Sequence, residues 1–438
     1  MGNKMEHDAS QDLVQLSLIM IARNEEKNIE KALESVRGIV YESIVADTGS
    51  TDKTVDIAGE LGAKIYNFEW IDDFSAAKNY AIEQATGNWV LVLDADEYFP
   101  QGDAQKLLDF LIEIESDQAS SDNCLAVGCM MVNLDDNGRQ TTRFRTVRVF
   151  RNIPSMRYIG RIHEWMDIDA GKIVHLDNIT MMHTGYAESV HEEKGKTERN
   201  IAMLRAELSR NPDDVNYKAY LANSLNSSTD PKYREEAAKL FTEILESKQR
   251  TQLLGILRVK LYTYFINKYM SDPDKLRESE QMCRQALEEL PGTLDFMYYL
   301  ALVFSKKGEH QKAWQLLREC ELRLKDNTQT DVSILIPADP TIIFSQMILT
   351  AKELGDIENV LLYSTHVLTI DKTRQSVLGP CIATMLYYGV SESETIELLS
   401  NIYDFKNPDD VTIVSTAARS CGATGFAGRV VDLTGESV

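Results

Sequence analysis

The chain has 438 residues, of which 43% are hydrophobic and 26% charged, and its formal net charge is -22. This length exceeds what one hydrophobic core usually supports, so we expect two domains in an ordinary globular protein. The acidic balance argues against a nucleic-acid partner, because proteins hold phosphate backbones with clustered Lys and Arg. The absence of a long apolar run and the polar start at residues 1–8 predict a cytoplasmic protein without an integral membrane segment.

The region from Leu16 to about Pro100 alternates apolar runs with amphipathic segments. This alternation is typical of βαβ units and a mainly parallel sheet. We predict strands at residues 16–22, 43–47, 64–66 and 89–93, separated by helices that begin after Asn24 as N-cap, at Ser50 and near Ser75. Residues 124–183 have the pattern of further β-structure.

The strand predicted at residues 89–93 ends abruptly in the acids Asp94, Asp96 and Glu97. Ligands of open α/β sheets bind at the carboxyl ends of the strands, so these acids would lie where a nucleotide binds. Residues two apart in an extended segment project to the same side, so we expect Asp94 and Asp96 to face one pocket. Asp96 would reach a divalent cation, and Asp94 a ribose hydroxyl or the water shell of the cation. The alternative is a solvated strand end.

Amphipathic helices dominate the chain after about Glu198, in pairs at residues 217–247 and 295–318. The placement of small residues and Gly resembles tetratricopeptide repeats, in which helix pairs stack into a solenoid. An irregular helical bundle is the alternative. We therefore predict a mostly parallel α/β domain at residues 1–198 and an all-α, repeat-like domain at residues 199–438.

Three motifs in one order resemble the family-2 glycosyltransferases of the GT-A fold. They are residues 21–25 (IARNE), 46–54 (ADTGSTDKT) and 93–96 (LDAD). Residues 73–79, 161–164 and 182–186, together with the helical half, are similar to the repeat-fused branch of sublancin-type peptide S-glycosyltransferases. The resemblance covers about residues 14–190. It implies an inverting, metal-dependent enzyme that moves a hexose from a nucleotide diphosphate sugar, with a UDP-sugar as the expected donor.

The resemblance also implies which side chains contact the donor. The expected donor-binding residues are Ala22, Asn24, Glu25, Asp47, Ser50, Lys78, Asn79, Asp94, Ala95 and Arg148. Asp47 would accept hydrogen bonds from the uracil imide or the ribose, or else cap the following turn. Glu25 would lie near the base or stabilise a helix N-terminus. Lys78 would face the diphosphate or be a solvated surface lysine, and Arg148 would hold phosphate or pair with the protein's own acids.

The expected metal ligands are Asp96 and His183, whose oxygen and nitrogen donors favour Mn²⁺ over Mg²⁺. A cation bridging the two phosphates would neutralise charge on the leaving group. His183 has an alternative interpretation as a structural residue. Glu164, flanked by His163, is the expected general base. The acid pair that many family-2 enzymes carry at this stage is not visible here, and a structural pair beneath Trp165 is the alternative.

Several acceptors and classes of protein remain open. Concave helical solenoids bind extended peptides, so we expect a polypeptide acceptor, modified at cysteine or serine and bound partly by the repeats. A polysaccharide or lipid-linked glycan is the rival acceptor. A non-catalytic scaffold is disfavoured because Asp47, Asp94 and Asp96 are all present. A nucleotidyltransferase is disfavoured because residues 22–25 contain no glycine to cradle a triphosphate. Self-association as a homodimer is also open.

Overall fold

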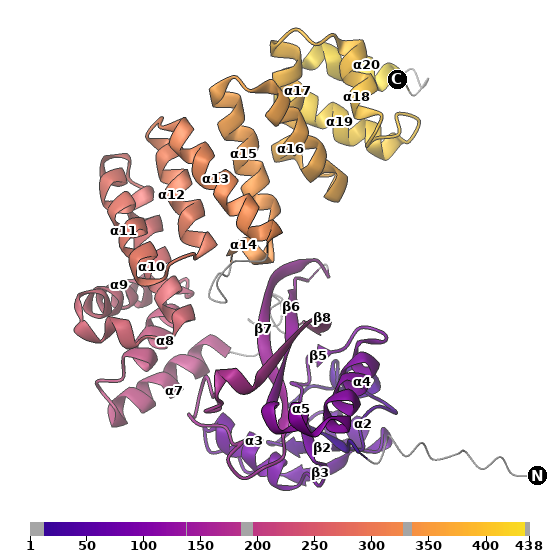
Figure 1. Ribbon diagram of the computed structural model, residues 1–438, viewed down its shortest axis with the longest axis vertical. Coiled ribbons are helices and arrows are strands. Elements are labelled where there is room, and N and C mark those ends of the chain that lie inside the picture. The colour runs from indigo at the N-terminus through magenta and orange to yellow at the C-terminus, as the bar shows by residue number, and fades with distance from the viewer. Residues whose placement is uncertain (1–12, 137, 185–195, 327–334, 434–438) are drawn as a thin grey trace, which may run out of the picture. The chain divides into compact units, whose positions relative to one another are not determined.

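The computed structural model describes residues 13–136, 138–184, 196–326 and 335–433 (Figure 1). Contacts between residues divide the chain into two compact units, residues 1–253 and residues 254–438. The first unit holds the sheet and the first helices after it, and the second is helical. An α/β fold followed by an all-α region confirms the predicted fold class, whereas the domain boundary after residue 198 stays a prediction.

The described strands form one eight-stranded sheet in the order β3-β2-β1-β4-β7-β6-β8-β5. Their bounds are β1 Leu16–Ala22, β2 Glu42–Asp47, β3 Lys64–Asn67, β4 Trp89–Val92, β5 Glu97–Tyr98, β6 Ala126–Leu134, β7 Gln140–Arg151 and β8 Ile173–His183. Strands β3, β2, β1 and β4 are parallel, as predicted. The other half is mixed: β7 runs antiparallel to β4 and β6, β8 runs parallel to β6, and β5 runs antiparallel to β8.

Helices cover both faces of this sheet. The helices of the first unit, whether or not they lie on the sheet, are α1 Ile29–Glu34, α2 Thr54–Glu60, α3 Phe74–Glu83, α4 Asp103–Ser116, α5 Gln118–Asn123, α7 Lys196–Arg210, α8 Val215–Asn226 and α9 Pro231–Glu246. Leu18 of β1 packs in one buried cluster with Leu107 of α4, and the next residue, Ile19, packs in the opposite cluster with Ile82 of α3. Because both faces are covered, the central strands are apolar along their whole length.

Two local predictions are wrong. The extended segment ends earlier than residue 93, since Glu97 N–H donates to the Asp94 carbonyl at 2.9 Å and the chain turns there. Residues 94 and 96 therefore do not obey the two-residue alternation of a strand. Asn24 does not cap a helix: α1 begins at Ile29 with Asn28 as its N-cap, and Asn24 has a positive φ of 56°.

The helices of the second unit follow one another closely along the chain. They are α10 Gly255–Met270, α11 Leu276–Glu289, α12 Leu294–Lys306, α13 His310–Lys325, α14 Leu335–Ala338, α15 Thr341–Leu354, α16 Ile357–Ile370, α17 Gln375–Tyr387, α18 Glu392–Leu399, α19 Pro408–Ser420 and α20 Thr424–Asp432. The predicted pairs are present as α8 with α9 and α12 with α13, the second pair turning at Gly308 with a φ of 77°. None of the described helices is both long and apolar enough to cross a membrane.

Candidate functional site

The carboxyl ends of β1 and β2 lie side by side, because Ala22 is paired in register with Asp47. The Asp47 carboxylate accepts hydrogen bonds from the backbone N–H of Gly49 and of Ser50, both at 3.1 Å. Asn24 N–H donates to Ser50 Oγ at 3.0 Å, and its Oδ1 accepts from Thr51 N–H at 2.8 Å. Asp47 therefore caps this turn, while a nucleotide contact by any of these residues stays a prediction.

Glu25 lies at the start of the first helix. Its carbonyl accepts from the backbone N–H groups of Asn28 and Ile29, and its carboxylate accepts from Asn28 Nδ2 at 2.9 Å. Its own N–H donates to Thr54 Oγ1 at 2.7 Å, which joins this segment to α2. Support of a helix N-terminus, one of the two roles expected for Glu25, is thus present.

Lys78 of α3 is the buried cation at the centre of the site. Its Nζ lies 2.6 Å from Glu164 Oε1 and 3.5 Å from Asp94 Oδ1, and only 4% of its side chain is exposed. Burial opposes its charge, but the carboxylates of Asp94 and Glu164 raise the pKa of Lys78. The interpretation of Lys78 as a solvated surface lysine is therefore wrong.

Arg148 of β7 links two of the acids that follow β4. Its guanidinium lies 3.2 Å from Asp94 Oδ2 and pairs with the buried carboxylate of Glu97. Burial would raise the pKa of Asp94, but Lys78 and Arg148 hold it well below its usual range. Burial raises the pKa of Glu97 to about 7, against the opposing charge of Arg148. Thus Arg148 does pair with the protein's own acids.

Two buried polar groups of this cluster lack hydrogen-bond partners among the described residues: Arg148 Nε and the Tyr158 hydroxyl. Tyr158 lies beside Lys78, whose Nζ is 5.2 Å from the centroid of the Tyr158 ring. Buried polar groups are normally paired, and an unpaired donor next to the proposed phosphate position is what an anionic ligand would satisfy.

Asp96 and His183 form a second pair beside this cluster. His183 Nε2 lies 3.5 Å from Asp96 Oδ1, and its Nδ1 lies 2.9 Å from Asn133 Oδ1. Burial opposes the charge of His183, but Asp96 and the neighbouring acids raise its pKa. Glu97 of β5 is paired in register with His183 of β8, and this pairing brings the preceding residue, Asp96, close to His183.

This pair fits a divalent metal ion as a partial ligand set. It offers one carboxylate and one imidazole, and Asn133 orients the imidazole through its other ring nitrogen. Within the described ranges, no group of three or more His, Cys, Asp or Glu side chains is placed to hold a metal by itself. Phosphate oxygens of a donor and water would have to complete the coordination. Gly185 and Tyr186, part of the motif around His183, lie outside the described residues.

Asn79 and Ala95, two further residues expected at the donor, lie in well-defined surroundings, and their contacts with a donor stay predictions. The Asn79 amide donates to the Tyr158 carbonyl at 2.9 Å and accepts from Tyr158 N–H at 2.8 Å. These two bonds give Asn79 a structural role, and its contact with a diphosphate stays a prediction. Ala95 is buried in the turn after β4.

Glu164 and His163 lie in a short segment, residues 159–165, that we call the base segment. Its ends pair with each other: Ile159 N–H donates to the Trp165 carbonyl at 2.7 Å, and Trp165 N–H donates back at 3.0 Å. Glu164 points to Lys78, whereas the exposed His163 ring stacks on Tyr220 of α8 at 3.8 Å between centroids. The two predicted catalytic side chains therefore have separate partners.

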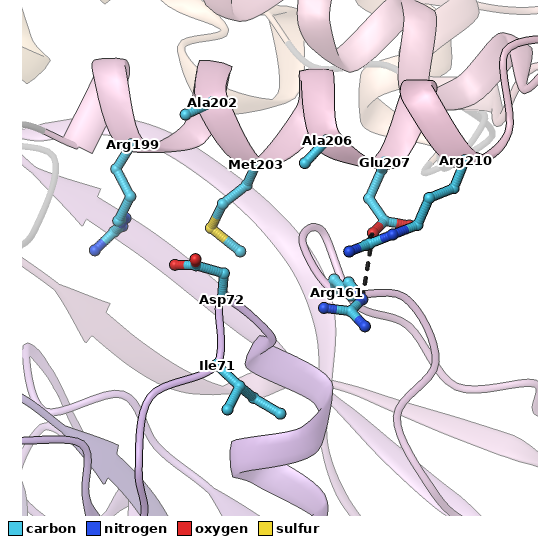
Figure 2. A pocket seen from close by; sticks show the side chains of 9 residues that line it. All are labelled: Ile71, Asp72, Arg161, Arg199, Ala202, Met203, Ala206, Glu207 and Arg210. Carbon is cyan, nitrogen blue, oxygen red and sulfur yellow. Dashed lines mark hydrogen bonds and ion pairs between the residues drawn. The ribbon is translucent and has the colours of Figure 1, made fainter.

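A cavity of about 220 Å³ lies between α7 and the loop that precedes α3 (Figure 2). Its lining residues are Ile71, Asp72, Arg161, Arg199, Ala202, Met203, Ala206, Glu207 and Arg210. Arg161 of the base segment reaches across to Glu207 of α7, with Nε 3.3 Å from Oε1. The cavity thus adjoins the segment that carries Glu164.

Tyr158 and Tyr220 belong to the site although the sequence pattern does not reveal them, and the sequence does not predict the pairing of Glu97 with Arg148. Glu97 follows the two predicted acids directly, and alternation along a strand would turn it away from them. Tyr158 and Tyr220 carry no motif, and only folding brings them to Lys78 and His163.

Residues 17–125 match the domain family described as Glycosyl transferase family 2. A TPR repeat-containing protein of Synechococcus elongatus is 35% identical over 222 residues, which are 49% of this chain and 52% of that protein. The SPbeta prophage-derived glycosyltransferase SunS of Bacillus subtilis is 28% identical over 211 residues, 47% of this chain and 48% of SunS. The chain spans about half the length of these curated relatives.

Among solved structures, S. aureus TarS matches with 16% sequence identity and a TM-score of 0.33, over 56% of this chain and 52% of TarS. The family match covers β1, β2 and β4 with the acids that follow them, so the resemblance stated from the motifs is confirmed. This chain carries a glycosyl transferase family 2 domain, which holds Asp47, Lys78, Asp94 and Asp96 and is followed by a helical region.

Proposed function

We propose that this protein is an inverting, metal-dependent glycosyltransferase that moves a hexose from a UDP-sugar to a polypeptide acceptor. The observation that carries the proposal is the buried charge cluster of Lys78, Arg148, Asp94 and Glu164 at the carboxyl edge of a family-2 domain. In that cluster the Nε–H of Arg148 is buried without a partner among the described residues, which supports an anionic ligand there.

The donor would bind across the ends of β1, β2 and β4. Asp47, Asn24 and Glu25 lie at the ends of the two strands where the uridine is expected, and Lys78 and Arg148 supply the positive charge for a diphosphate. Asp96 and His183 would hold Mn²⁺ or Mg²⁺. When bound, this cation acts as a Lewis acid that neutralises charge on the departing diphosphate.

Glu164 is the proposed base that takes the proton of the acceptor nucleophile. Lys78 holds the Glu164 carboxylate in place at 2.6 Å. A diphosphate bound next to Asp94 would compete for the same ammonium group, which would leave the Glu164 carboxylate free to face the acceptor nucleophile. Donor binding would therefore prepare the base for the acceptor.

A polypeptide acceptor, modified at cysteine or serine, is supported by the helices that follow the sheet, since stacked helices offer extended surfaces for peptides. SunS, which matches over 211 residues, is itself described as a glycosyltransferase. A polysaccharide or lipid-linked glycan is the alternative acceptor. The cytoplasmic location and the homodimer expected from the sequence also stay predictions.

The first test is release of nucleoside diphosphate from UDP-, GDP- and dTDP-sugars with Mn²⁺ or Mg²⁺, comparing the native protein with Asp96→Asn. We expect turnover of one uridine donor, and a fall of about 100-fold or more in the variant, because the cation site loses its charge. Asp177→Asn is the matched control, since Asp177 of β8 pairs with Arg145 of β7 and not with His183. Equal turnover in Asp96→Asn would refute the metal assignment. No turnover and no donor binding by the native protein would favour a non-catalytic scaffold.

A further inference from the structure

We propose that helices α7 and α8 are part of the catalytic apparatus, and that Tyr220 of α8 is a positioning residue for the base segment. The inference deepens the proposed function, because it rests on Glu164 as the base. It assigns the first helices after the sheet a role in holding a reacting group, in addition to any role in binding an acceptor.

The base segment includes one residue, His163, in a backbone conformation that its side chain does not favour, whereas glycine readily adopts the positive φ of Gly160. Gly160 has a φ of 90° and His163 a φ of 55°. A histidine in the left-handed region is uncommon and costs free energy, so such a conformation persists only where the surroundings hold it. The pairing of Ile159 with Trp165 closes the segment into a loop.

One side of the loop is held by α3. Ser75 Oγ donates to the Gly160 carbonyl at 2.5 Å, and Phe74 N–H donates to the Arg161 carbonyl at 2.8 Å. Lys78, on the same helix, holds the Glu164 carboxylate. These three contacts hold one side of the loop against α3.

The other side is held by α7 and α8. The Tyr220 ring lies parallel to the His163 ring, with 3.8 Å between centroids and 10° between planes. A Cβ placed on Gly160 would lie 2.9 Å from the Tyr217 hydroxyl, so α8 approaches the loop closely there. Arg161 pairs with Glu207 of α7 at 3.3 Å (Figure 2), and it also lies 3.6 Å from Asp73, the N-cap of α3.

His163, which adjoins Glu164, and Arg161, three residues before Glu164, therefore both contact helices that follow the sheet. These contacts act together with those from α3, where Lys78 holds the Glu164 carboxylate. Loss of the Tyr220 ring would free His163 to leave its left-handed backbone and would move Glu164 from Lys78. A base displaced by about 1 Å loses most of its catalytic effect.

The decisive variant is Tyr220→Ala in the full chain, with Tyr220→Phe to keep the ring. Tyr233→Ala on α9 is the matched control, because it removes an aromatic ring that lies under Arg205 of α7 rather than one that stacks on His163. The probes are turnover of UDP-glucose with Mn²⁺, calorimetric binding of UDP, and hydrogen exchange at the backbone amides of Phe74, Ile159 and Trp165. Those three amides donate to, or within, the base segment.

For Tyr220→Ala we expect kcat to fall about 10- to 100-fold while the Kd for UDP changes less than about 2-fold, because only the placement of the base is affected. Exchange at the three amides should rise about 10-fold, since the loop opens more often. Tyr220→Phe and Tyr233→Ala should resemble the native protein in all three measurements. Glu207→Gln, which removes the charge facing Arg161, should shift exchange and kcat in the same direction and serves if Tyr220→Ala does not fold.

Native exchange rates and native turnover in both Tyr220→Ala and Glu207→Gln would overturn the inference. Failure of the proposed function is a separate result: the native protein would then turn over no nucleotide-sugar, and the exchange measurements alone would decide whether α7 and α8 hold the segment. A loss of UDP binding equal to the loss of turnover would also contradict a positioning role.

Discussion

Glu42, at the start of β2, joins three segments of the sheet through one buried carboxylate. It accepts hydrogen bonds from Ser17 Oγ at 2.7 Å, from Thr86 N–H at 2.7 Å and from Lys64 Nζ at 2.7 Å. Burial opposes its charge, but these partners lower the pKa of Glu42 to about 2. A group whose pKa is lower in the folded state stabilises the fold above its unfolded pKa and loses that contribution as the pH falls.

We predict that Glu42→Gln lowers the free energy of unfolding by roughly 2–3 kcal/mol near pH 7, because the shift of the Glu42 pKa is lost. The difference between native protein and variant should shrink as the pH falls from about 4.5 toward 2. Urea titrations at several pH values measure it. Glu235→Gln, in an exposed pair with Lys239, should show no such difference. A difference that is constant with pH would contradict the assignment to Glu42.

Asp94 and Asp96 show what the sequence could not predict about the site. Asp94 and Asp96 were expected to share a face, yet Asp94 turns to Lys78 and Arg148 while Asp96 turns to His183. The reason is the turn after β4, in which Glu97 N–H donates to the Asp94 carbonyl. The hydrophobic pattern of the sequence does not predict this turn. The residue types therefore indicated the site, whereas the backbone conformation determines which partners each acid contacts.

At the level of elements, the apolar runs predicted the strands well. The bounds of β1 agree with the predicted residues 16–22, and the predicted helix near Ser75 begins at Phe74, where Asp73 caps it by accepting from Ala76 N–H at 2.9 Å. Burial on both faces makes such runs unambiguous. The order of β5 to β8 could not be predicted, because the pairing of strands that are distant in sequence leaves no local pattern.

The residues that lead into β4 closely approach the start of β1. A Cβ on Gly87 would lie 2.1 Å from the Gln15 carbonyl oxygen and 2.6 Å from Ser17 Oγ. We predict that Gly87→Ala lowers the free energy of unfolding by about 3 kcal/mol, since backbone must move to admit the methyl group. Thermal and urea unfolding measure this loss.

Gly59→Ala is the control for that substitution, because Gly59 lies in α2 with nothing within 4 Å of an added Cβ. Alanine favours a helix over glycine, so this variant should be neutral or more stable by up to about 1 kcal/mol. Equal effects of the two substitutions would show that the contact with Gln15 does not constrain β4.

At the level of the whole molecule, the chain combines two compact units with different kinds of packing. In the first, strands distant in sequence pair across one sheet; in the second, each helix packs mainly on its neighbours along the chain. Units of these two kinds need not unfold together.

We predict two unfolding transitions by calorimetry. Phe296→Ala, which empties a fully buried position in α12, should lower one transition, and Gly87→Ala should lower the other. A cost of about 3–5 kcal/mol is expected for the loss of a buried Phe side chain. A single transition that both variants lower equally would mean that the units unfold as one.

The first compact unit ends at residue 253, after α9, and it contains each contact described around Glu164. Helices from residue 254 onward could thus be lost, gained or exchanged between relatives without altering the residues that hold Glu164, the proposed base. If the proposed function holds, selection could then act on the recognition of a new acceptor and on the rate of the proposed transfer as two separate traits. A protein that joins residues 1–253 to the helical region of a relative would be one product of such an exchange.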